Sequence, residues 1–138
     1  MKSDDDVDLL ALVATDVPSV AREAGVSLLM RDRTIIHVVW QQSLKNPDPR
    51  VWLRILKLVQ RAGKWAQIRV YLDAAKMGDE RVSAYAAEQL QRWVDRFNRS
   101  FAQPTSSERR DLEEKFEGVR GGLPSGLANE LSFVLRTS

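Results

Sequence analysis

Hydrophobic residues recur at helical spacing along most of the chain, and helix-breaking residues divide this pattern into segments. The clearest division is Asn46-Pro47-Asp48-Pro49, where each proline disfavours helix in the residue before it. From Pro49 to Ala62 the apolar positions cover more than half of a helix circumference, whereas a surface helix needs an apolar stripe of only about 100°. We therefore predict a helix over 49–62 that packs on at least two sides.

Further helices are predicted by the same pattern and by their end signals. A helix over 64–77 ends at Gly78, which we expect to be a left-handed C-terminal cap. The longest helix is expected over 79–101, and two more over 106–119 and 125–135. Shorter helices precede Asn46, and the acidic residues expected to cap helix N-termini are Asp16, Asp32, Asp48 and Asp79. Thr105 and Glu108 match a capping box. The predicted fold class is all-α, with about seven helices.

The sequence also carries a weak period of 31 residues. Pro18 and Val20 anticipate Pro49 and Val51 at this offset. The clearest matched positions are Asp48, Arg50, Val51, Gln60 and Arg61, which recur as Asp79, Arg81, Val82, Gln91 and Arg92. Copies at a fixed spacing joined by short turns predict stacked helical hairpins. We expect one domain over 1–138, with repeat units over 17–103 and capping helices over 104–138.

The openings of two units, Asp48-Pro49-Arg50-Val51 and Asp79-Glu80-Arg81-Val82, resemble those of HEAT-like helical repeats. The resemblance covers about residues 17–103. It implies a short right-handed stack of antiparallel helix hairpins, an α-solenoid, whose concave side holds a partner that is usually another protein. Two features depart from the family: the units are short, and the third fuses into one long helix.

Composition limits the chemistry and the location of the protein. The chain has no cysteine, which excludes disulfides, thiol nucleophiles and thiolate metal sites. Residues 1–8 are acidic and lack the layout of a signal peptide, and no apolar run is long enough to span a membrane. We expect a cytoplasmic protein that does not insert into membranes.

Candidate catalytic groups are sparse. His37 is the only histidine, and it lies between Ile36 and Val38 in the middle of a predicted helix. Neighbouring carboxylates, such as Glu113 and Glu114, point about 100° apart on a helix and do not converge on one proton or metal ion. We expect no enzymatic activity, no cofactor and no metal.

Basic residues are concentrated in the central part of the chain. Residues 17–103 hold 15 Lys or Arg and 8 Asp or Glu. Arg50, Arg54, Lys57 and Arg61 follow at steps of four, three and four, which places them on one ridge of the predicted helix. Arg81, Arg92 and Arg96, followed by Arg99, extend the ridge on the next unit if the units stack.

This basic strip has three interpretations. It is a solvated helix face, a surface for an acidic protein, or a surface for nucleic acid. Trp65 lies near the tip of a hairpin, where it either packs against the neighbouring turn or anchors a partner. We expect a protein–protein interaction module, such as an adaptor, assembly subunit or inhibitor, with nucleic-acid binding as the alternative. Self-association is a further possibility, through Leu9, Leu10 and the thin apolar stripe of the 106–119 helix.

Overall fold

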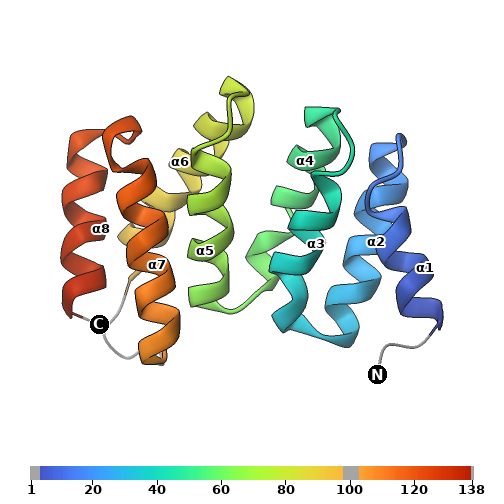
Figure 1. Ribbon diagram of the computed structural model, residues 1–138, viewed down its shortest axis with the longest axis horizontal. Helices are drawn as coiled ribbons and strands as arrows, with labels where there is room; N and C mark the ends of the chain where they lie inside the picture. The colour runs from blue at the N-terminus through green and yellow to red at the C-terminus, as the bar shows by residue number, and fades with distance from the viewer. Residues whose placement is uncertain (1–3, 98–102, 138) are drawn as a thin grey trace. The chain divides into compact units, whose positions relative to one another are not determined.

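The computed structural model describes residues 4–97 and 103–137, and these residues form helices and turns without strands (Figure 1). The α-helices are α1 Asp4–Leu12, α2 Pro18–Arg31, α3 Ile36–Ser43, α4 Pro49–Leu56, α5 Lys64–Ala75, α6 Glu80–Asp95, α7 Ser106–Val119 and α8 Ser125–Thr137. Three short 3₁₀ helices are η1 Arg33–Ile35, η2 Val59–Arg61 and η3 Arg120–Gly122. The predicted all-α class is confirmed for the described residues. The HEAT-like stack stays a prediction.

The chain divides into two compact units, Met1–Val70 and Tyr71–Ser138. In the first unit α2 packs against α1 and α4, and α3 packs against α4. The expectation that the helix after Pro49 packs on two sides is therefore confirmed. The core of this unit is formed by buried apolar side chains, among them Leu28, Leu29, Ile36, Val39, Trp40, Ile55, Leu56 and Leu58.

Asn46 ties the α1–α2 connection to the α3–α4 connection. Its buried side-chain amide donates from Nδ2 to the Ala14 carbonyl at 3.1 Å and to Asp16 Oδ1 at 2.9 Å. Its Oδ1 accepts from the backbone N–H of Asp48 at 2.8 Å, and its carbonyl accepts from Trp52 Nε1 at 2.7 Å. The prediction that Asp16 caps α2 is wrong: Val17 is the N-cap residue, and no side-chain hydrogen bond caps this helix.

The helix predicted over 49–62 is interrupted. α4 ends at Leu56 and the chain continues through the 3₁₀ helix η2. At the end of this segment, two backbone carbonyls accept hydrogen bonds from side chains and not from later backbone N–H groups of the same helix. Arg33 Nε donates to the Arg61 carbonyl at 2.8 Å, and Gln67 Nε2 donates to the Ala62 carbonyl at 2.8 Å. These two side chains satisfy carbonyls that the end of a helix leaves without an intrahelical partner.

In the second unit α8 packs against α6 and α7, and Figure 1 shows α7 beside α8. Its core includes Leu90, Trp93, Leu112, Phe116, Leu127, Leu131 and Leu135. The apolar stripe of α7, Leu112, Phe116 and Val119, is buried in this unit. The suggestion that this stripe forms an exposed contact surface is therefore wrong, because α7 needs its stripe to pack within its own unit.

Two helix ends differ from those predicted in the second unit. α6 ends at Asp95, with Arg96 as its C-cap, and not at Phe101, which lies outside the described residues. Gly78 is not a left-handed cap, since no glycine in the described ranges has a positive φ. In contrast, α7 spans its predicted bounds and begins with the capping box of Thr105 and Glu108.

The recurring Asp-x-Arg-Val sequence has a local structural meaning. Asp48 accepts from the N–H of Arg50 at 2.9 Å, and Asp79 accepts from the N–H groups of Arg81 and Val82 at 3.0 and 3.1 Å. The valine of each copy, Val51 or Val82, is fully buried. The predicted caps Asp48 and Asp79 are thus confirmed. Helices α2, α4 and α6 begin 31 residues apart, at Pro18, Pro49 and Glu80.

Candidate partner-binding surface

Three cationic side chains of the predicted ridge lie on the exposed side of α4 and η2. Arg54, Lys57 and Arg61 are exposed, while Ile55 and Leu56 between them are buried. Within the described part of the chain, none of the three makes an ion pair with a carboxylate. The predicted basic ridge is therefore exposed even though α4 ends at Leu56. Its regular helical spacing does not continue beyond Lys57.

Arg50, the first residue of the ridge, is electrostatically different. Its guanidinium lies 2.9 Å from Asp48 Oδ2 and also donates from Nε to both carboxylate oxygens. The hydrogen bond and charge of Asp48 raise the pKa of Arg50 above its ordinary value. Since Asp48 already compensates its charge, Arg50 contributes less than the other three residues to the attraction of an acidic partner.

Arg33 is a fourth cation that sequence reasoning missed. Its Nε–H donates to the Arg61 carbonyl, which holds the guanidinium at the end of η2. The neighbouring Asp32 is engaged elsewhere: its carboxylate accepts from the N–H of Thr34 at 2.9 Å and from its hydroxyl at 2.6 Å, and these bonds lower the pKa of Asp32. No local pattern connects residues 28 positions apart, so only the fold places Arg33 here. We call Arg33, Arg54, Lys57 and Arg61 the basic face.

Trp65 and the arginines of the second unit are weaker candidates for partner binding than the basic face. Trp65 is only partly exposed, in the first turn of α5. Arg81 pairs with Asp79 at 3.7 Å, and Arg92 pairs with Glu88 at 2.9 Å. Arg96 is exposed beyond the end of α6, and Arg99 lies outside the described residues. A continuous strip joining these arginines to the basic face stays a prediction, because it would connect the two units.

Candidate metal-ligating groups do not converge in the described ranges. His37 is half-buried on α3, and no three His, Asp or Glu side chains there are arranged to hold a metal ion. Comparison of the chain with protein-family models, curated proteins and solved structures gave no match. In the described residues, no helix combines the length and apolar character that crossing a bilayer demands.

Proposed function

We propose that this protein is a non-enzymatic protein-interaction module whose basic face binds an acidic surface of another protein. The observation that carries the proposal is a contrast among the exposed basic residues. Arg50, Arg81 and Arg92 have carboxylate partners, whereas Arg54, Lys57 and Arg61 have none among the described residues. Like charges one helical turn apart destabilise a helix by a few tenths of a kcal/mol, and an acidic partner supplies the missing counter-charge.

The proposed architecture is a short HEAT-like stack of antiparallel helix hairpins in the cytoplasm, acting as an adaptor, assembly subunit or inhibitor. It is supported by the 31-residue spacing of the starts of α2, α4 and α6. In such a stack the second helix of each hairpin repeats along one side of the molecule. The basic face on α4 and η2 would then be continued by Arg81 and Arg92 of α6 and by Arg96 at its C-terminal end.

The test compares two triple variants of the full chain with the same loss of charge. One replaces Arg54, Lys57 and Arg61 by Ser, and the control replaces Lys45, Arg110 and Arg120, which are exposed but lie outside the proposed surface, by Ser. The ligand is a fluorescent 16-residue helical peptide rich in Glu, and its affinity is measured by anisotropy at several salt concentrations. We expect the first variant to lose at least ten-fold in affinity and the control to lose less than three-fold.

Nucleic-acid binding is the alternative function, and the same proteins test it. Phosphate contacts release counterions, so the logarithm of the affinity for DNA or RNA falls steeply and linearly with the logarithm of the salt concentration. Tight binding of a 20-base duplex at low salt that disappears only in the basic-face variant would favour this alternative. Equal behaviour of the two triple variants towards peptide and nucleic acid would refute both functions for the basic face and leave it a solvated surface.

A further inference from the structure

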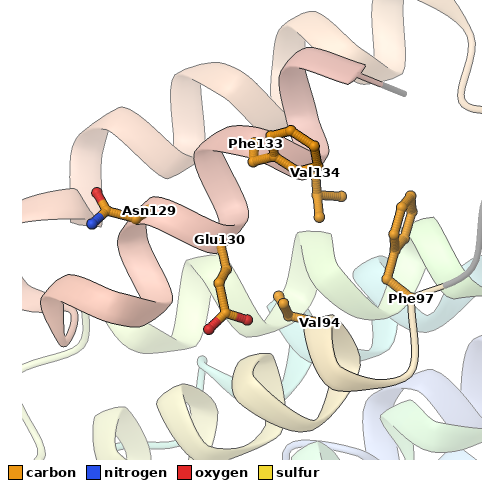
Figure 2. A pocket seen from close by; sticks show the side chains of 6 residues that line it. All are labelled: Val94, Phe97, Asn129, Glu130, Phe133 and Val134. Atoms are coloured by element: carbon orange, nitrogen blue, oxygen red, sulfur yellow. The ribbon is translucent and has the colours of Figure 1, made fainter.

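An open apolar groove lies between α6 and α8 in the second unit. Its volume is about 400 Å³, and its lining is mostly apolar. The lining residues are Val94, Phe97, Asn129, Glu130, Phe133 and Val134 (Figure 2). The groove is as large as a small-molecule site, but it is too open to enclose a small ligand on most sides. Its form suits a side chain presented from another surface.

Two phenylalanines form the walls of the groove. Phe133 is 55% exposed, although it lies between buried residues of α8. Phe97 is positioned by Trp93, whose ring centroid is 5.6 Å away and whose own side chain is buried. Figure 2 shows Phe97, from the connection after α6, and Val134, from α8, directed into the same space. An aromatic wall that is already held in place loses little conformational freedom when a partner binds.

One end of the groove is acidic. Gln91 Nε2 donates to Asp95 Oδ1 at 3.0 Å and to Glu130 Oε2 at 3.4 Å, so one amide group holds both carboxylates together. Neither carboxylate makes an ion pair with a lysine or arginine of the described chain. Figure 2 shows the Glu130 carboxylate beside Val94.

A positive charge lies further along α8. Arg136 follows Phe133 by three residues on α8, is exposed, and donates from Nε to the Ser132 carbonyl at 3.3 Å. This bond keeps the guanidinium close to α8. The groove therefore combines an apolar lining with a carboxylate pair beside it, which favours a positively charged partner.

We propose that this groove binds an amphipathic α-helix of another protein. A large apolar side chain of that helix inserts between Phe97 and Phe133, and a Lys or Arg one turn away pairs with Asp95 and Glu130. The lining residues span one to two turns of each helix, which matches the spacing of such anchors on a helical ligand. Charge complementarity selects a basic helix, because the carboxylate pair gains a counter-ion that the described residues do not supply. The proposal is independent of the basic face.

The experiment uses the full chain and two synthetic 18-residue helical peptides with the same leucine face. One has Lys beside that face and the other has Gln, so neither carries the acidic residues that the basic face attracts. Fluorescence anisotropy at low salt measures both affinities. We expect the Lys peptide to bind at least ten-fold more tightly than the Gln peptide.

Two variants and their matched controls locate the binding site. Phe133→Ser should lower the affinity for the Lys peptide at least ten-fold, whereas Met30→Ser, at a methionine 80% exposed in the first unit, should not. The double change D95N/E130Q should make the two peptides bind equally, whereas E113Q/E114Q on α7 should preserve the preference for Lys. Circular dichroism establishes that each variant is folded.

Three results would overturn the proposal. The first is binding of the Lys peptide that is unaffected by Phe133→Ser, or no binding at all. The second is equal affinity of the original chain for the Lys and Gln peptides. The third is a concentration-dependent dimer, detected by sedimentation, that Phe133→Ser dissociates, because a second copy of the chain would then be the occupant of the groove.

Discussion

Gly25 of α2 lies so close to Leu58 that a Cβ atom on Gly25 would meet Leu58 Cδ1 at 2.7 Å. The same atom would lie 3.4 Å from Ile55 Cδ1 and 3.5 Å from Val39 Cγ1. A glycine inside a helix costs about 1 kcal/mol relative to alanine. Here the missing side chain allows α2 to approach α4, so the local cost is offset by packing in the core of the first unit.

The variant Gly25→Ala should therefore lower the free energy of unfolding by about 1 kcal/mol, because overpacking of a buried site costs about 1–3 kcal/mol and outweighs the gain in helix propensity. Gly118→Ala is the matched control: Gly118 lies on α7 with no atom within 4 Å of its added Cβ. It should stabilise the protein by about 0.5–1 kcal/mol. Urea denaturation measures both values, and a stabilising Gly25→Ala would mean that Leu58 moves aside without cost.

Removal of the Asn46 side chain should be among the more damaging polar substitutions in the first unit. Asn46→Ala deletes three hydrogen bonds at a residue that is 4% exposed, and we expect a loss of about 2–3 kcal/mol in the free energy of unfolding. Asn129→Ala on the exposed side of α8 is the control and should change it by less than about 0.5 kcal/mol.

The charged variant Asn46→Asp tests the direction of the same hydrogen bonds. A carboxylate cannot donate to the Ala14 carbonyl and would repel Asp16, so its folded-state pKa should be raised. Asn46→Asp should therefore be less stable than Asn46→Ala at pH 7 and should regain stability as the pH falls towards 4. Chemical denaturation at several pH values measures this, and an Asn46→Asp variant as stable as the original chain would contradict the assigned donor.

The Asp73–Lys115 ion pair joins α5 to α7 within the second unit. Lys115 Nζ lies 2.7 Å from Asp73 Oδ1, and the two side chains are only 19% and 12% exposed. Lys115→Met removes the closer cation from a largely buried carboxylate, while Lys76 stays 3.7 Å from it, and we expect a loss of about 1–3 kcal/mol. Arg92→Met breaks the exposed pair with Glu88 and should cost less than about 0.5 kcal/mol. Similar losses for both variants would show that burial adds little to the Asp73–Lys115 pair.

Because of Tyr71, the free energy of unfolding should fall at alkaline pH. Burial raises the pKa of the Tyr71 phenol, and the charge of Tyr85 raises it further. The folded state then holds a proton that the unfolded chain releases above about pH 10, so stability is complete below this pH and falls as the pH rises above it. Tyr71→Phe should reduce this alkaline loss, as measured by chemical denaturation between pH 8 and 11.

The same variant should also be informative at neutral pH. Among the described residues the buried Tyr71 hydroxyl has no hydrogen-bond partner, and an unsatisfied buried polar group costs about 1–3 kcal/mol. Tyr71→Phe should therefore raise the free energy of unfolding by about 1 kcal/mol at pH 7. Tyr85→Phe, at a half-buried residue, is the comparison and should have a smaller effect. A destabilised Tyr71→Phe variant would indicate that the hydroxyl is hydrogen-bonded in solution.

The helix-start signals could be predicted because they act over a few residues. Asp48 and Asp79 cap the next amides, and Thr105 and Glu108 bond to each other across one turn. The apolar spacing of α8 likewise identified Leu127, Leu131 and Leu135 as core, since helical periodicity reports which side of an element avoids water. The prediction for Asp16 was wrong because a long-range contact engages it: its carboxylate accepts a hydrogen bond from Asn46, 30 residues away.

The sequence by itself determined the helical class, most helix starts and the apolar positions, because these depend on neighbours within one or two turns. It also determined that Arg54, Lys57 and Arg61 are exposed, since their steps of three and four place them on the helix face opposite the apolar residues. Only the tertiary structure decided where α4 ends, that Arg33 joins Arg61, and that α6 and α8 leave a groove beside Phe133. Each of these depends on which distant segments meet, and no local preference of the chain specifies that choice.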